Sequence, residues 1–265
     1  MKSVSALIIT FNEEMKISNC LESLGWADEI IVVDANSTDR TRELCLDPSK
    51  PWAARIRVIQ RAWTGFKDQR NFSLDQSMHE WVFVVDADEI CTPELRTRIR
   101  EILSDSVALE RQAYKVRRCE FFMGRPIHHG MWNPSYQDRF FCKTGVRYIN
   151  DVHEYPVFLK PPGEIHEPLL HKSDLTIEKF LDKVNRYTTI EAKDRFEQGQ
   201  RTHLFRMIAA FPAHFLKTLF YYQGYRDGIH GVVIALLEGV ARVIRQLKIW
   251  QMMKKNDRVD LNVSR

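Results

Sequence analysis

The chain has 265 residues, with 39 Lys and Arg against 35 Asp and Glu and a formal net charge of +4. Hydrophobic residues make up 44% and charged residues 28%, which excludes a collagen-like, low-complexity or wholly disordered chain. The positive surplus is too small for this length to indicate nucleic-acid binding, so we expect no nucleic-acid partner.

The cysteines and the hydropathy point to a reduced, cytoplasmic protein. The five cysteines are odd in number and widely spaced, so we expect free thiols rather than disulfides or a zinc knuckle. No window of about 18 uncharged apolar residues occurs, which predicts no transmembrane helix. Met1-Lys2-Ser3-Val4 runs directly into a strand-like segment, so we expect no signal peptide.

Strand and helix patterns alternate over the first hundred residues. Short apolar runs predict strands at Val4–Thr10, Glu29–Asp34, Ile56–Gln60 and Trp81–Asp86. Apolar spacing and capping residues predict helices at Glu13–Leu24, Arg40–Cys45 and Lys67–Met78, and one that starts at Pro93. This alternation is typical of a parallel sheet with helices on both faces, in which ligands bind at the carboxyl ends of the strands.

After the first hundred residues the pattern changes twice. Shorter strands are predicted at Ala113–Phe122, Gln137–Cys142, Val146–Val152 and His166–His171, as an antiparallel extension of the sheet. From Thr176 onward the periodicity predicts helices over roughly 176–198, 202–222 and 230–255. We therefore expect an α/β domain over 1–175 and a helical extension over 176–265.

The helical extension is basic and rich in aromatic residues. Between Ala192 and Arg258 there are twelve Lys and Arg against five Asp and Glu, with eight Phe, Tyr and Trp residues from Phe205 to Trp250. This combination favours association with an anionic membrane interface. The alternative is that the aromatic residues pack against the main domain and the basic residues form a solvated face.

The strongest local signal is Asp86-Ala87-Asp88-Glu89, at the end of an apolar strand. Two carboxylates in that position offer hard oxygen ligands to Mg²⁺ or Mn²⁺, which can bridge a diphosphate. The metal would offset the charge that develops on a departing nucleoside diphosphate. The alternative is a solvated turn at the acidic start of a helix.

Two further strand ends carry candidate nucleotide-binding residues. Asp34 ends the second strong strand and can accept hydrogen bonds from a base or a ribose, while Ser37 to Asp39 fit helix capping. Thr10, Phe11, Asn12 and Glu13 follow the first strand, where the aromatic ring can stack on a base and Asn12 can fix the loop. An Asx-turn explains Asn36 to Asp39 equally well.

Taken together, these motifs resemble those of family 2 glycosyltransferases with a GT-A fold. The similarity lies in I-I-T-F-N-E at 8–13, V-V-D-A-N-S-T-D at 32–39, Gln69-Arg70-Asn71 and V-V-D-A-D-E at 84–89. Val152-His153-Glu154, Leu170-His171, Asn185–Thr188 and Gly224–Gly228 extend the resemblance to about residue 250. Within the family, D-E-I-I-V-V-D at 28–34 is most similar to the branch of lipopolysaccharide-core β-1,4-glucosyltransferases.

This resemblance implies a fold and a donor site. The fold would be an α/β, Rossmann-type mixed sheet flanked by helices, with a C-terminal helical extension. Uridine would be held by Thr10, Phe11, Asn12, Glu13 and Asp34, and Arg70 would approach the diphosphate. Asp86 and Asp88 would place Mn²⁺ or Mg²⁺, with Asp88 as the direct ligand. His171 would complete the metal shell or contact the diphosphate, unless it is a structural histidine.

The resemblance also implies a catalytic base, because an inverting transfer needs a carboxylate to deprotonate the acceptor hydroxyl. Glu154 is the first choice since it matches the V-H-E of the branch, Asp151 is the reserve and Asp138 comes third. The E-D pair that often supplies the base in other family 2 enzymes does not occur here. The alternative is that this segment only shapes the acceptor cleft.

The expected function is inverting, metal-dependent transfer of a hexose, most simply glucose from UDP-glucose, to a lipid-linked saccharide. Lipopolysaccharide core is the first acceptor that the resemblance implies, and a polyprenyl-linked glycan is the next. The enzyme would lie in the cytoplasm, peripheral on the inner face of the membrane. Two rivals are a nucleotidyltransferase, which usually has a Gly-rich phosphate loop that this chain lacks, and a non-catalytic, membrane-associated binding module.

Overall fold

The computed structural model describes residues 1–150, 154–173 and 176–263, with side chains up to residue 255. The chain divides into two compact units. The first comprises Met1–Cys119 and Ser135–Ser173, and the second comprises Glu120–Pro134 and the helices that follow residue 176. The predicted division at residue 175 thus separates the helices, but segment 120–134 also groups with them.

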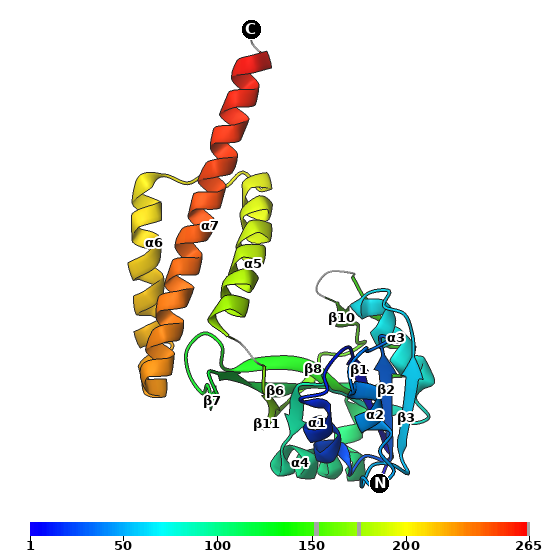
Figure 1. The fold of residues 1–265 in the computed structure, drawn as a ribbon. Coiled ribbons are helices and arrows are strands. Elements are labelled where there is room, and N and C mark those ends of the chain that lie inside the picture. The colour runs from blue at the N-terminus through cyan, green and yellow to red at the C-terminus, as the bar shows by residue number, and fades with distance from the viewer. Residues whose placement is uncertain (151–153, 174–175, 264–265) are drawn as a thin grey trace. The chain divides into compact units, whose positions relative to one another are not determined.

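The first unit is organised around a mixed β-sheet (Figure 1). The strand order is β3-β2-β1-β4-β8-β6-β11-β5, and short β7 (Arg125–Pro126) pairs with the end of β6. The strands are β1 (Val4–Thr10), β2 (Glu29–Asp34), β3 (Ile56–Gln60), β4 (Trp81–Val84), β5 (Glu89–Cys91), β6 (Ala113–Phe122), β8 (Ser135–Cys142) and β11 (Gly163–His171).

The strand directions confirm the predicted change of pattern. β3, β2, β1 and β4 are parallel, whereas β4 with β8, β8 with β6, and β11 with β5 pair antiparallel. β1, β2 and β4 are nearly continuous apolar runs because helices cover both faces of this half of the sheet. Thr10 pairs with Asp34 at the last position of β1 and β2, so their following loops leave the same edge.

Three strand predictions need correction. The run predicted as Trp81–Asp86 ends as a strand at Val84, because Asp86 accepts a backbone hydrogen bond from Glu89 and starts a turn. The strand predicted over Val146–Val152 is reduced, within the described residues, to β9 (Tyr148–Ile149), which pairs with β10 (Tyr155–Pro156). β5 was not predicted, since three residues carry too little periodicity to be recognised.

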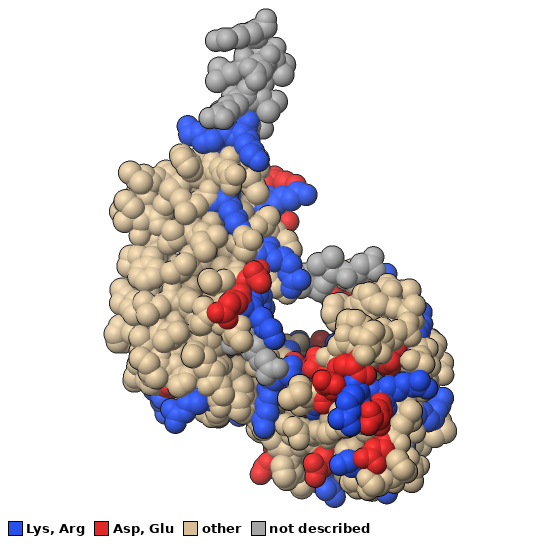
Figure 2. Space-filling view, in the orientation of Figure 1, with Lys and Arg blue, Asp and Glu red and all other residues tan. Residues whose placement is uncertain are grey.

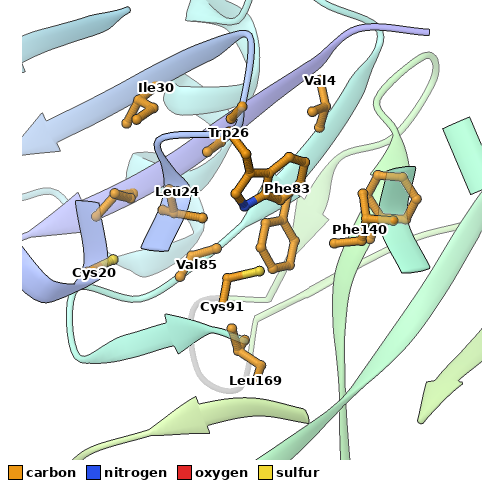
Figure 3. Close-up of a cluster of buried hydrophobic side chains, with 14 of the residues drawn as sticks. Val4, Cys20, Leu24, Trp26, Ile30, Phe83, Val85, Cys91, Phe140 and Leu169 are labelled. Atoms are coloured by element: carbon orange, nitrogen blue, oxygen red, sulfur yellow. The ribbon is translucent and has the colours of Figure 1, made fainter. Parts of the chain in front are cut away.

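Helices cover the two faces of the sheet with separate hydrophobic cores. On one face, α1 (Ile17–Leu24) and α4 (Pro93–Ser104) contribute to a cluster with Phe83 and Val85 at its centre (Figure 3). On the other face, Leu74 of α3 (Phe66–Gln76) packs with apolar residues of β1, β2 and β4. Burial of each large apolar side chain stabilises the unit by about 1.5–3 kcal/mol.

Local signals explain where the helices begin. Thr92 caps α4, because its hydroxyl accepts a hydrogen bond from the backbone N–H of Leu95, and Pro93 occupies the first helical position as predicted. α1 begins at Ile17 rather than at the predicted Glu13, because Asn12 adopts a positive φ of 53° that keeps the preceding loop out of the helix. α2 is the short helix Thr41–Cys45.

The second unit consists of helices that lie side by side (Figure 1). These are α5 (Ile177–Glu197), α6 (Leu204–Leu216) and α7 (Gly228–Val263). The helix predicted over 202–222 is interrupted, since α6 continues as a π-helical turn, η2 (Lys217–Tyr221), before the 3-10 turn η3 (Gly224–Asp227). No described helix is long and apolar enough to cross a membrane.

Segment 120–134 is tied to these helices by specific hydrogen bonds. The Asp227 carboxylate accepts the backbone N–H groups of His128 and His129, and the indole of Trp132 donates to Glu238 at 3.1 Å. Phe122 and Ile127 form a small core with Ile234 of α7. These contacts explain why the segment belongs to the helical unit although it lies between two strands in the sequence.

Candidate active site

A cavity of about 590 Å³ opens at the carboxyl ends of β1, β2 and β4. This is the edge at which ligands bind in open α/β sheets. Its lining combines apolar and aromatic residues with four charged groups from the loops after β1 and β4 and from α3. The lining residues are Ile9, Thr10, Phe11, Glu13, Ala35, Trp63, Phe66, Arg70, Asp86, Ala87 and Asp88. Six of the sequence-predicted site residues therefore meet in one cavity.

The loop after β1 is held by the loop after β2. Asn12 donates its backbone N–H to the Ser37 hydroxyl at 2.9 Å and accepts the backbone N–H of Thr38 on its side-chain oxygen at 2.8 Å. Glu13 donates its backbone N–H to the Thr41 hydroxyl at 2.7 Å. Because the side chain of Asn12 is engaged in this way, it positions the loop, while Phe11 stays 54% exposed and lines the cavity.

Asp34 lies directly beneath this pair of loops. Its side chain is fully buried, and both carboxylate oxygens accept the backbone N–H of Ser37 at 3.2 Å. The Ser37 hydroxyl donates to the same carboxylate. The predicted capping by Ser37 to Asp39 needs correction, because the N-cap of α2 is Arg40 without a side-chain hydrogen bond; Asp39 instead accepts the backbone N–H of Thr41, two residues on, at 2.9 Å. Asp34 and Ser37, which the sequence assigned to separate roles, thus form one hydrogen-bonded unit.

Asp86 is held between two buried guanidinium groups. Arg70 of α3 donates to its Oδ1 at 2.9 Å, and Arg139 of β8 donates to both carboxylate oxygens. Burial by itself would raise the pKa of Asp86, but the charges of Arg139 and Arg70 outweigh it and hold the pKa well below its usual range. Asp86 therefore stays ionised and fixes the position of Arg70.

Arg139 also binds the fully buried Glu89, at 2.7 Å. Burial raises the pKa of Glu89, and the charge of Arg139 only partly offsets this effect. The second Glu89 oxygen accepts the backbone N–H of Asp86 at 2.9 Å, which closes the turn after β4. A carboxylate without its guanidinium would be strongly disfavoured here, because an isolated buried charge loses its hydration.

Neither Arg139 nor Glu89 was predicted as part of the site. A bulge in β8 explains why, since Tyr114 pairs with Phe140 but Lys115 pairs with Asp138, which leaves Arg139 as the extra residue. Bulges redirect a side chain relative to the alternation of a regular strand. Three consecutive residues are consequently buried: Arg139, Phe140 and Phe141. The alternation of a regular strand does not predict this pattern.

Asp88 and His171 form the other charged pair. His171 ends β11 opposite Glu89 of β5, and its Nε2 lies 3.2 Å from the Oδ2 of Asp88. Burial raises the pKa of Asp88, but the hydrogen bond and charge of His171 lower it overall. The Asp88 carboxylate is an oxygen ligand of the kind that Mg²⁺ and Mn²⁺ prefer, with the His171 imidazole beside it, although the described residues contain no group of three or more His, Cys, Asp or Glu arranged around a metal.

The candidate bases have different surroundings. Glu154 lies beside Arg70, with Oε1 3.3 Å from Nε, so the same guanidinium joins Asp86 and Glu154. Asp151 lies outside the described residues. Asp138 has a buried Oδ1 with no hydrogen-bond partner among the described residues, and burial raises its pKa. Glu154 is thus the candidate that the structure connects to the cavity.

Trp63 and Phe66 are cavity residues that the sequence reasoning missed. Their rings meet edge to face with centroids 4.7 Å apart, and both are about half exposed at the cavity. Gly65 between them has a φ of 113°, a value that disfavours any other residue. The available signal was two aromatic residues flanking a glycine just after a strand, in an otherwise polar segment.

The comparisons with known proteins agree with this geometry. The family model described as glycosyl transferase family 2 matches residues 5–153, more than half of the chain. The chain is 31% identical to the lipopolysaccharide core biosynthesis glycosyltransferase LpsC of Rhizobium meliloti, over 94% of this chain and 92% of that protein. It is 29% identical to the uncharacterized glycosyltransferase RT0209 of Rickettsia typhi, over 98% and 90%.

The chain therefore belongs to glycosyl transferase family 2, and it is a homologue of a lipopolysaccharide-core transferase. The predicted family and the GT-A-like mixed sheet flanked by helices are both confirmed. Among solved structures, Staphylococcus aureus TarS is similar at 14% identity and a TM-score of 0.48, over 94% of this chain and 91% of that one. That score indicates only a loose similarity, and nothing about ligands follows from it.

Proposed function

We propose that this glycosyltransferase moves a hexose, glucose from UDP-glucose, with inversion onto a lipid-linked saccharide such as lipopolysaccharide core. The observation that carries the proposal is the cavity, in which aromatic rings lie together with Arg70, Asp86 and Asp88. A nucleoside diphosphate has matching parts, since its base stacks on aromatic faces and its phosphates attract guanidinium groups. The similarity to LpsC supports the choice of acceptor.

In the proposed donor complex the nucleoside lies against the loops after β1 and β2. Phe11, Trp63 and Phe66 supply ring faces and edges for the uracil, and Thr10 lines the cavity beside them. Asp34 is fully buried outside the cavity lining, so it would act on the nucleoside by holding Ser37 and the loop after β2. Glu13 lines the same cavity. Arg70 approaches the diphosphate from α3, and its planar fork suits bidentate binding of phosphate oxygens.

Asp88 and His171 would hold Mn²⁺ or Mg²⁺ directly. When bound, the ion neutralises negative charge that builds up on the departing diphosphate. Asp86 fits a different role, because guanidinium groups of Arg70 and Arg139 already occupy both its oxygens. We assign to Asp86 the positioning of Arg70 and of the turn that carries Asp88.

In the transfer step Glu154 would accept the proton of the acceptor hydroxyl. The hydroxyl oxygen then forms a bond to the anomeric carbon while the bond from that carbon to the diphosphate oxygen breaks, which inverts the configuration. Arg70 contacts the Glu154 carboxylate at 3.3 Å and can orient it while facing the diphosphate. Asp151 is the reserve base in the same segment.

The composition of the helical unit supports the choice of acceptor and location. A saccharide carried on lipid is presented at a membrane surface, and the basic, aromatic-rich helices are suited to that interface. The enzyme would thus work as a peripheral protein on the cytoplasmic face of the inner membrane.

Release of UDP from a panel of UDP-sugars, with and without Mn²⁺, tests the proposal. We expect metal-dependent UDP release from UDP-glucose by the wild type and its loss in Asp88→Ala. Glu101→Ala is the matched control, because Glu101 is an exposed carboxylate on α4 outside the cavity. Isothermal titration with UDP and Mn²⁺ completes the test. No UDP release together with no UDP binding would refute the uridine donor.

A further inference from the structure

An apolar stripe runs along the exposed side of α6. Phe205, Ile208, Pro212 and Leu216 follow one another at intervals of three and four residues, so they lie on one face of the helix. All four are exposed, with 76% of Phe205, 66% of Ile208 and 50% of Leu216 accessible to solvent. This spacing normally marks the face of a helix that is buried.

The stripe is not the face by which α6 packs against its neighbour. Phe211 approaches α7 so closely that a Cβ on Gly239 would lie 2.9 Å from its ring. His214 lies on the same side, within 3.3 Å of Arg242 of α7. α6 is therefore apolar on two sides, and only one of them is covered. A short helix of this kind suits a position within an interface.

The apolar surface continues beyond α6 into the π-helical turn. Phe220 and Tyr221 of η2 are 60% and 74% exposed. Lys217 lies over the ring of Tyr221, with its ammonium group 5.9 Å from the ring centre. Aromatic side chains next to a lysine are typical of the level of lipid headgroups, where one end of each side chain is apolar and the other is wet.

The charged side chains in and around α6 and η2, over residues 198–226, are all basic. Residues 198–226 contain four Lys and Arg (Arg201, Arg206, Lys217 and Arg226) and no Asp or Glu. Figure 2 shows that the surface over α6 is almost entirely uncharged, in contrast to the mixed charges over the first unit. An apolar surface in a segment whose charged side chains are all basic is complementary to an anionic surface with an apolar interior.

We propose that Phe205, Ile208, Leu216, Phe220 and Tyr221 form a docking face that enters the headgroup region of an anionic phospholipid bilayer. Arg206 and Lys217 would contact the lipid phosphates at the rim of this face. The apolar side chains supply affinity through burial, and the basic ones supply the preference for anionic lipid. α6 would lie in the plane of the interface rather than cross it.

The charge of the docking face favours a bilayer, rather than a second copy of this chain, as the surface that covers it. Two copies joined through this face would bring four Arg and Lys side chains of each copy together without an acidic partner in the same segment. An anionic bilayer has no such repulsion. The proposal deepens the proposed function by specifying how the enzyme reaches a lipid-linked acceptor, but docking is measured without donor or acceptor.

Flotation of the purified full chain with vesicles tests the docking face. We expect binding to phosphatidylcholine vesicles that contain phosphatidylglycerol, weaker binding to phosphatidylcholine alone, and further weakening by salt. The double variant Phe205→Ser/Ile208→Ser should lower the partition constant at least about tenfold, because two large apolar side chains lose their burial. Arg206→Gln/Lys217→Gln should lower it about tenfold, but only for the anionic vesicles.

Met78→Ser/Leu159→Ser is the matched control, because both side chains are exposed apolar residues of the first unit. Circular dichroism and UDP release from UDP-glucose show whether each variant is folded and intact at the donor site.

Equal binding of wild type and Phe205→Ser/Ile208→Ser, or no binding of the wild type to either vesicle, would overturn the docking face. A dimer in light scattering that the same variant abolishes, without vesicle binding, would instead assign the face to a second copy. UDP release that persists in either case leaves the proposed transferase activity intact.

Discussion

The two units of this protein place their charged and apolar side chains in opposite ways. In the first unit apolar residues form a buried core on each face of the sheet, and acidic groups such as Asp86 and Glu89 are paired with arginines inside the site. In the second unit, residues 198–226 have no acidic side chain, and Phe205, Ile208 and Tyr221 are exposed.

This difference indicates what each unit recognises. Preorganised, buried charges in a cavity suit a small polyanionic ligand, since the protein dipoles and charges need not reorganise when it binds. Exposed apolar side chains with basic neighbours suit an extended surface that is itself apolar inside and anionic outside. The predictions that follow test the paired charges, the cavity and the helical unit in turn.

The largest effect is expected from removal of the buried arginine. Arg139→Met should lower the free energy of unfolding by about 3–5 kcal/mol, because it leaves Asp86 and Glu89 without their shared counter-ion. Urea unfolding of the full chain, followed by circular dichroism, measures this. Arg98→Met is the control, since Arg98 pairs with Glu101 on the surface and should change stability by less than about 0.5 kcal/mol.

A second substitution sharpens the same test. Arg139→Met/Glu89→Gln should be more stable than Arg139→Met alone, because the glutamine removes a buried negative charge while it keeps a carbonyl oxygen for the backbone N–H of Asp86. If the double variant were less stable than Arg139→Met, the pairing of Arg139 with Glu89 would not be what stabilises the turn after β4.

Replacement of the proposed base should affect the rate rather than donor binding. Glu154→Gln keeps a hydrogen-bond acceptor for Arg70 but cannot take a proton, so we expect kcat to fall about 10³-fold with little change in the Kd for UDP. Asp151→Asn serves as the comparison. A larger loss in Asp151→Asn than in Glu154→Gln would transfer the role of base to Asp151.

The aromatic wall of the cavity should matter for binding of the nucleotide. Trp63→Ala should weaken UDP binding by about 1–3 kcal/mol, which is the range for one base stacked on an aromatic ring. Trp250→Ala is the control, because Trp250 is similarly exposed but lies on α7. Isothermal titration measures both variants, and equal affinities would remove Trp63 from the donor site.

The smallest effect is a pH dependence in the helical unit. Burial first, and then the charges of Arg242 and Arg245, lower the pKa of His214 to about 4. The folded protein therefore keeps His214 neutral where the unfolded chain, with a pKa near 6.5, already binds a proton. The contribution of His214 to the free energy of unfolding is therefore complete above about pH 6.5. It is lost as the pH falls toward about 4.

His214→Gln isolates that contribution, because glutamine can still accept a hydrogen bond from Arg242 without titrating. Between neutral pH and about pH 4.5 the wild type should lose about 1–2 kcal/mol more stability than His214→Gln. Urea unfolding at the two pH values measures this difference. An equal loss in both proteins would show that His214 is not protonated in this range on unfolding.

Much of the first unit was predictable because the residues that indicate each strand or motif are neighbours in the sequence. The strands at Val4–Thr10 and Glu29–Asp34 were predicted at their observed bounds, since buried parallel strands are nearly uninterrupted apolar runs. Ile56–Gln60 was also predicted at its observed bounds, although it is only partly buried. Asp86 and Asp88 were recognised because they follow such a run at the edge where ligands bind.

The partners of those carboxylates could not be predicted in the same way. Arg139 reaches Asp86 across 53 residues, and only a bulge in β8 turns its side chain inward. Trp63 and Phe66 belong to a segment without periodicity, so nothing in the sequence places their rings at the cavity. These residues depend on long-range contacts that a local window does not contain.

The sequence by itself determined the family, the alternation of strands and helices over the first hundred residues, and the positions of the carboxylates, because motifs and periodicity are local properties of the chain. Only the tertiary structure decided which charges meet. Asp86 lies in the turn after β4, and folding brings Arg70 of α3 and Arg139 of β8 to it. It also decided which apolar faces stay open. The periodicity of α6 shows apolar residues on two sides, and only packing against α7 reveals that Phe205 and Ile208 lie on the uncovered one.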